Sequence, residues 1–413
     1  MVASTNIKFY VHTNTNAPQL QNAFGCMINV LDACLVNGFG SQSISTLTAS
    51  GNTVTATFSS AHNFMQYQVI EIAGATQTEY NGEHRILTVP NANSITFQLA
   101  AAPSVNTATG TISCSLPALG WLKPFSGTGK AAYRSSNTLL ASRPYLRVVD
   151  VLDPAYTETY AKFAKVGIVE DMTDIDTMLG VQAPYDSANP DKNWVGTGSG
   201  TGAVNGWARW YYASATESTN SSYNIDYQAP TNGNVTWVLV GTEDYFYVIP
   251  EIRVGYSAGL IYGFGAIDSL IPVDNANTFL SSTLNANSAS NNAHKIRNTA
   301  LSNDLFSSCL LQRNYKNETN YNTCFSKSFL SGNLTGNSNI LTNDSYAGVT
   351  AFDVFALEGS VLRGKFKGIK WLYSNLPYSN LALIVFNNQI YLSKNVAAQS
   401  NNLGQILLNV GEL

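Results

Sequence analysis

The stretch Thr53-Val-Thr-Ala-Thr-Phe58 alternates hydroxylated and apolar side chains over six residues. Successive side chains of a β-strand point to opposite faces, so this period of two predicts a half-buried strand. Its inner face would carry Val54, Ala56 and Phe58. Ser50-Gly51-Asn52, directly before it, is typical of a turn between strands. The pattern indicates a mainly β fold.

The same alternation continues toward the C-terminus. Further strand-like runs occur at Gln68–Ile72, Arg85–Val89, Ser94–Leu99 and Thr109–Cys114. Short strands at a spacing of about 10–12 residues predict a small all-β sandwich or barrel. We place this module at residues 43–117, between Gly38-Phe39-Gly40 and Leu119-Gly120-Trp121. Because both flanks are turn-like, we expect the module to be inserted into a larger host domain.

Before the module, apolar side chains recur at helical spacing. They are Leu20, Phe24, Met27, Ile28, Leu31, Cys34 and Leu35. Pro18 suits the first turn of a helix, Asn14 or Asn16 could cap it, and Asn37-Gly38 would end it. This segment predicts an amphipathic helix of about five turns that packs through one face.

The remainder of the chain is also predicted to be mostly strands. Tyr145–Val151 has a strand pattern, and Thr236–Val240 and Tyr245–Ile249 form a predicted hairpin around Gly241–Asp244. The inner face of that hairpin would carry Trp237, Leu239, Phe246 and Val248. Later strands are predicted at Val349–Leu357, Leu362–Lys367, Ala382–Phe386 and Gln389–Leu392, with Asn387-Asn388 as a hairpin turn.

Two polar segments interrupt these strands. Asp186–Gly206 is predicted to be a long loop, and Asn275–Asn303 a loop or a short polar helix. The fold class is therefore a β-sandwich-like host domain with one N-terminal amphipathic helix and an inserted β module. We divide the chain into a helix-containing part at 1–42, the module at 43–117, a β host domain at 118–275 and a C-terminal β region at 276–413.

Composition narrows the classes of function. Charged residues make up 12% of the chain and the formal net charge is −4. Nucleic-acid-binding proteins usually carry a basic patch, so we expect no nucleic-acid partner. The densest basic cluster is predicted to be a solvated strand face; it comprises Arg363, Lys365, Lys367 and Lys370.

Cellular location is constrained by two further features. The five cysteines form no Cys-x-x-Cys pair, which favours buried thiols over disulfides or a zinc site. The first residues resemble no signal peptide, and no apolar run reaches the roughly 18 residues of a membrane span. We therefore expect folding in a reducing cytoplasm and no membrane span.

The acidic cluster Glu170, Asp171, Asp174 and Asp176 is the strongest candidate for chemistry. Paired carboxylates could bind calcium or cleave a glycoside. However, the EF-hand glycine and closing glutamate are missing. A turn in which Asp side chains accept backbone N–H groups is the favoured interpretation.

Two other motifs are weaker. Gly196-Thr-Gly-Ser-Gly-Thr-Gly202 lacks the Lys-Ser/Thr of a phosphate-binding loop, so a flexible loop is favoured. The aromatic stretches Trp207–Tyr212 and Tyr245–Tyr247 could form a sugar-binding platform, but core or subunit interface is favoured. The sequence therefore assigns no catalytic, cofactor-binding or metal-binding residue, and predicts that the protein is not an enzyme.

Several short motifs resemble those of tailed-bacteriophage virion structural proteins. Among them are Val30–Gly40, Gly120-Trp-Leu-Lys-Pro-Phe-Ser126, Tyr145–Val148, Met172–Asp176, Trp237–Gly241 and Tyr262–Gly265. The module resembles small β repeats of phage tail and surface proteins, through Ala61–Phe64, Val69–Ala75 and Tyr80–Glu83. The chain departs from this pattern at Gly241-Thr-Glu-Asp244, where the family commonly has Gly-Asp-Gly.

The resemblance implies a multi-copy virion component of the tail or baseplate, assembled in the bacterial cytoplasm. Its partners would be other virion proteins and further copies of itself. Three alternatives remain open. They are a capsid decoration protein that projects the module, an adhesin that binds a host surface glycan through its aromatic residues, and a polysaccharide-degrading enzyme that uses carboxylates such as Asp174 and Asp176.

Overall fold

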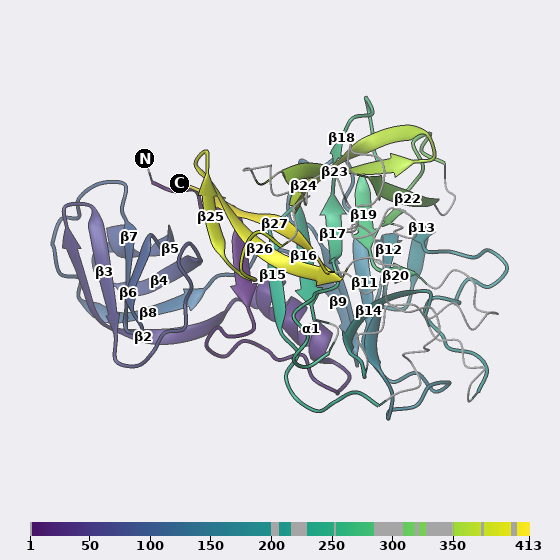
Figure 1. Ribbon diagram of the computed structural model, residues 1–413, viewed down its shortest axis with the longest axis horizontal. Helices are drawn as coiled ribbons and strands as arrows, with labels where there is room; N and C mark the ends of the chain where they lie inside the picture. The colour runs from purple at the N-terminus through teal and green to yellow at the C-terminus, as the bar shows by residue number, and fades with distance from the viewer. Residues whose placement is uncertain are drawn as a thin grey trace.

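The computed structural model is mainly β, with 50% of residues in strands and 5% in helices, which confirms the predicted fold class. The strands of the described residues form three sheets (Figure 1). The structure describes residues 2–199, 206–215, 229–251, 253–284, 309–318, 322–327, 349, 351–372, 376–397 and 403–413, with only the backbone at 322–327.

The first sheet contains the predicted module strands and lies at one end of the molecule (Figure 1). Its order is β5 (Gly82–Arg85), β4 (Val69–Ala75), β8 (Gly110–Leu116), β2 (Phe39–Ser50), β3 (Thr53–Phe58), β7 (Ser94–Gln98) and β6 (Thr88–Asn91). Val54, Ala56 and Phe58 are buried, as the alternation predicts. The division of the chain into four parts stays a prediction.

The second and largest sheet has 13 strands. Its path runs through β1 (Lys8–Val11), β15 (Trp237–Gly241), β16 (Tyr245–Pro250), β17 (Tyr262–Ala266), β19 (Thr278–Ser281), β21 (Cys309–Leu311), β22 (Asn322–Lys327), β23 (Ala351–Glu358), β24 (Val361–Leu372), β27 (Leu403–Glu412), β26 (Gln389–Ala397) and β25 (Leu383–Phe386). The short strand β18 (Asp268–Ser269) pairs with β24 outside this path.

This large sheet curls over on itself, so that β1 and β15 contact β27. Val238 and Val240 of β15 share one core with Trp371 of β24 and Ile406 of β27. The alternate residues of the β15–β16 hairpin face the opposite way. As predicted, Trp237, Leu239, Phe246 and Val248 share the other core.

A third sheet packs against that second face. Its order is β20 (Thr283–Leu284), β14 (Ala208–Ala213), β12 (Lys162–Met172), β11 (Tyr145–Val149), β10 (Lys130–Arg134) and β9 (Leu122–Gly127), with β13 (Met178–Ala183) paired to β12. Trp210 of β14 meets Phe246 edge-on at 6.1 Å and stacks on Tyr262 at 5.8 Å. Strands β15–β17 are thus buried on both faces.

The N-terminal helix is shorter than predicted. Helix α1 spans only Cys26–Leu31 and continues as a π-helical segment over Asp32–Asn37. It ends at Gly38 as predicted, but with φ +69° and ψ 172° this glycine does not adopt the predicted left-handed helical conformation. The predicted start at Pro18 is wrong, because the Pro18 carbonyl accepts the indole N–H of Trp237 and Leu20 forms a β-bridge with Val235.

The C-terminal strand predictions are confirmed by β23, β24, β25 and β26. Asn387 and Asn388 form the turn between β25 and β26 with positive φ angles of 49° and 62°. The predicted loop or helix at 275–303 is wrong over 278–284, which carries β19 and β20, and 285–303 lies outside the described residues. Residues 186–199 contain turns and no strand, in line with the predicted loop.

Candidate assembly interface

The acidic segment after β12 forms the predicted turn. Asp174 Oδ1 accepts the N–H groups of Asp176 and Thr177, each at 2.9 Å. Asp176 binds Lys130 Nζ and Arg147 Nη2, both at 2.7 Å, and the hydrogen bond from Lys130 is the main cause of its lowered pKa. Carboxylates held in these contacts are fixed as anions that organise the turn.

The other two acidic side chains face different partners. Glu170 forms a bidentate pair with Arg313, at 2.7 and 2.8 Å, and accepts Gln312 Nε2 at 2.9 Å. Asp171 Oδ1 accepts the N–H of Met172. Within the described part of the chain, no three acidic, His or Cys residues are grouped so as to hold a metal ion.

The aromatic stretches are part of the core. Trp207, Trp210, Tyr211 and Tyr212 are at most 8% exposed, and the Tyr245–Tyr247 segment at most 5%. These side chains therefore present no platform to a sugar, and the predicted core interpretation is confirmed. The adhesin alternative loses the residues on which it depended.

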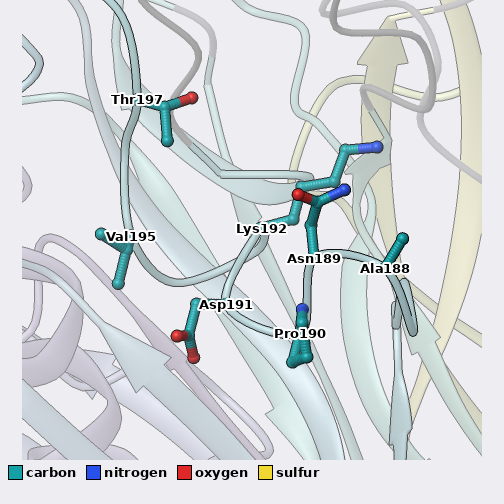
Figure 2. Close-up of a pocket in the computed structure, with 7 residues that line it drawn as sticks. All are labelled: Ala188, Asn189, Pro190, Asp191, Lys192, Val195 and Thr197. Atoms are coloured by element: carbon teal, nitrogen blue, oxygen red, sulfur yellow. The ribbon is translucent and has the colours of Figure 1, made fainter.

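The predicted long loop contains a hollow of about 490 Å³ (Figure 2). Figure 2 shows Asp191 and Lys192 pointing away from each other. Lys192 Nζ is 3.2 Å from an Asp186 oxygen and lies over the Trp207 ring at 4.6 Å, so its charge is already matched. Gly196 donates its N–H to Asp153 Oδ2 at 2.7 Å. This hydrogen bond fixes the first glycine of the segment 196–202, which was predicted to be a flexible loop.

Cys26, Cys34, Cys114 and Cys309 are buried, as predicted; the side chain of Cys324 lies outside the described residues. Burial raises the pKa of Cys34 and Cys114. Thiols in this state are poor nucleophiles, because the thiolate is the reactive form.

The predicted solvated basic face needs one correction. Arg363 is 0% exposed and pairs with Asp274 at 2.9 Å and Glu358 at 2.7 Å. A buried guanidinium needs paired acceptors, and the chain supplies them from outside β24. The other three members stay partly exposed on that strand: Lys365, Lys367 and Lys370.

Strand β25, at the end of the large sheet, is an edge strand with exposed apolar side chains. It pairs with β26, and no other described strand pairs with its outer edge. Val385 is 46% exposed and Phe386 is 65% exposed. Edge strands are usually protected by charges, proline or bulges, because their free N–H and C=O groups invite pairing with another chain.

A groove of about 920 Å³ adjoins this edge. Its lining includes Val349, Ile384, Phe386, Tyr378 and Tyr391. A smaller hollow of about 170 Å³ shares Lys370 and Tyr391 with it, so the concave surface continues across the outer face of β24 and β26. This exposed apolar surface makes the strand and its groove the candidate interaction site of the described residues. We name Leu383–Phe386 with this groove the β25 edge.

Sequence reasoning located strand β25 but missed its exposure. The run Leu383-Ile-Val-Phe386 has four apolar residues in succession, which is typical of a strand buried on both faces. In the structure the last two are open to solvent. The unbroken apolar run was therefore a signal in the sequence, but it predicted burial and not the exposure that the structure shows.

Comparisons with known proteins give little further information. No protein-family model matches the chain, and no curated protein matches it. A solved structure, the phage phi92 endosialidase, is similar over 90% of this chain and 52% of its own, with 11% identity and a TM-score of 0.17. The chain thus spans about half the length of that protein. A TM-score this low carries no argument about fold or function.

Across the described ranges, no helix is both long and apolar enough to cross a membrane. By its strand content and its antiparallel sheets, the described structure belongs to the class of mainly β proteins.

Proposed function

We propose that this chain is a non-enzymatic structural protein of a tailed-bacteriophage particle, present in many copies in the tail or baseplate. The observation that carries the proposal is the β25 edge, where an apolar strand lies open at the end of a sheet. Such an edge is a template for pairing with another chain. Its partners would be other virion proteins and further copies of itself, and its location the virion assembled in the host cytoplasm.

The phage part of the proposal rests on the sequence resemblance. The motifs that carry this resemblance lie in the core of the fold. Trp237–Gly241 forms strand β15, which is buried on both faces. Trp121 of the Gly-Trp motif packs edge-on against Phe246, with ring centroids 5.2 Å apart. Motifs that build the core support a shared architecture more than a shared chemistry.

The enzyme and adhesin alternatives have less support. Asp174 is engaged with backbone N–H groups and Asp176 with two cations, and the predicted aromatic platform is buried. A capsid decoration protein remains the second candidate, since the module lies at one end of the molecule where it could project (Figure 1).

The proposal is tested by purifying intact particles on a density gradient and quantifying this chain by mass spectrometry. We expect many copies per particle, and gold-labelled antibody on the tail or baseplate. Label on the capsid surface would favour the decoration protein instead. Recovery of the chain only as free protein in the lysate would contradict a structural role.

A second assay addresses the enzyme alternative directly. Purified protein is incubated with capsular polysaccharide of the host, and released sugar ends are counted. We expect no turnover. Turnover that Asp174→Asn with Asp176→Asn abolishes, in a variant that keeps the wild-type melting temperature, would overturn the non-enzymatic proposal.

A further inference from the structure

We infer that the partner of the β25 edge is a second copy of this chain, which pairs antiparallel with it through β25 about a two-fold axis. The inference rests on the proposed assembly function and specifies its partner. It starts from the place of β25 as the terminal strand of the 13-stranded sheet, with β26 on its inner side. Figure 1 shows β25 among the yellow C-terminal strands, on the side nearer the first sheet.

Charge is the first argument for a second copy. Between Leu376 and Ser393 the chain carries no Asp, Glu, Lys or Arg. In a two-fold interface each group lies close to its own equivalent, so every charge near the axis meets a like charge. A strand without charges avoids this repulsion, and Lys370, which lines the groove, is already paired with Asp353. A partner of opposite charge would therefore find no charge on β25 to complement.

The exposed side chains are the second argument. Val385 and Phe386 point to opposite faces of the strand, and both are exposed. A neighbouring strand paired to β25 would cover side chains on both faces at once, which a partner resting on only one face could not do. Phe386 also borders the 920 Å³ groove, which gives a second strand's side chains a surface to pack against.

The two-fold geometry restricts the register. Residues directly opposite each other in an antiparallel pair lie on the same face of the sheet. Val385 of one copy must therefore meet Val385 or Leu383 of the other, since these residues share a face. A lysine at position 385 would place two positive charges close together at this junction.

The test is the mass of the full chain in solution, measured by sedimentation velocity over a range of micromolar concentrations. We expect the wild type to associate to twice its 44.5 kDa or a multiple of that mass. Val385→Lys should be monomeric at the same concentrations. Leu139→Lys, which adds the same charge at a residue that is 92% exposed elsewhere, should associate like the wild type.

Hydrogen exchange of the wild type provides a measurement that does not depend on a variant's folding. We expect the amides of residues 383–386 to become better protected as the concentration rises. A wild type that stays monomeric, or a folded Val385→Lys that associates as before, would overturn the inference. Such a result leaves the particle-composition test untouched, so failure of this pairing and failure of the proposed function are distinguishable.

Discussion

At the scale of single residues, Arg85 shows how the first sheet is attached to the rest of the chain. Its guanidinium donates to the carbonyl oxygens of Ser4 (2.7 Å), Tyr67 (2.7 Å), Val410 (2.8 Å) and Ile7 (2.9 Å). Burial lowers its pKa to about 10, since these carbonyls carry no full charge. One side chain of the module thus binds both ends of the chain.

Replacing this side chain should loosen the junction. We expect Arg85→Ala to lower the free energy of unfolding by about 2–4 kcal/mol, because several buried carbonyls lose their donor. Arg143→Ala is the matched control, since among the described residues Arg143 donates to the single carbonyl of Ser135 and its loss should cost about 1 kcal/mol or less. Urea unfolding followed by tryptophan fluorescence measures both. An equal decrease in the free energy of unfolding for the two variants would show that the Arg85 hydrogen bonds contribute no more to stability than those of Arg143.

His84 makes the stability of the module depend on pH. Its Nε2 lies 2.9 Å from the Tyr80 carbonyl oxygen, its ring stacks on Phe97 at 4.4 Å, and burial lowers its pKa below the usual 6.5. The unfolded chain therefore binds a proton more readily than the folded one. The contribution of His84 is complete above about pH 6.5 and is lost as the pH falls below that value.

We therefore expect the free energy of unfolding to fall between pH 7.5 and pH 5.5. His84→Gln should show a shallower fall, measured by urea unfolding at each pH. The dependence will not vanish, because burial also lowers the pKa of His12 and His62. Identical slopes in the wild type and the variant would exclude His84 as a source of the pH dependence.

At the scale of elements, helix α1 is held by a residue far away in sequence. Asp150, just after β11, accepts the N–H of Met27 at 2.9 Å through Oδ2 and the hydroxyl of Tyr212 at 2.7 Å through Oδ1. It is 1% exposed, and burial raises its pKa. A carboxylate at a helix N-terminus satisfies N–H groups that have no partner within the helix.

Removing that cap should destabilise the helix and β14 together. We expect Asp150→Ala to cost about 2–3 kcal/mol, since a buried N–H and a buried hydroxyl lose their acceptor. Asp150→Asn keeps one acceptor oxygen and should cost less. Thermal unfolding followed by near-UV circular dichroism ranks the variants. A larger loss for Asn than for Ala would contradict the capping account.

The same element explains where sequence reasoning failed and where it succeeded. The apolar spacing from Leu20 to Leu35 was helical, but the cap that fixes the start at Cys26 comes from Asp150, which no local pattern reveals. Strand β3 and the β15–β16 hairpin were predictable from local sequence. In β3 every second side chain is buried in one core, and in the hairpin alternate side chains lie in two different cores. Strand β19 was missed, since its four residues lie in a polar segment and are buried by distant strands.

At the scale of the whole molecule, the sheets form one connected body. Gln68 of the module exchanges hydrogen bonds with Asn14, at 2.9 and 3.0 Å, and donates to the Phe9 carbonyl at 3.0 Å. Together with those of Arg85, these contacts fix the first sheet against the N-terminal and C-terminal strands of the large sheet. The fold class could be predicted from the sequence. The exposure of β25 could not, because it depends on which strand lies last in the sheet, and this order is set by pairing between strands that are distant in sequence.

The central claim is that this chain assembles into a phage particle through its apolar β25 edge. A reconstruction of the intact particle in which this chain is traced tests it most directly. The account predicts repeated copies in the tail or baseplate, with Val385 and Phe386 buried against β25 of a neighbouring copy. Particles without this chain, or copies whose β25 faces solvent, would contradict it.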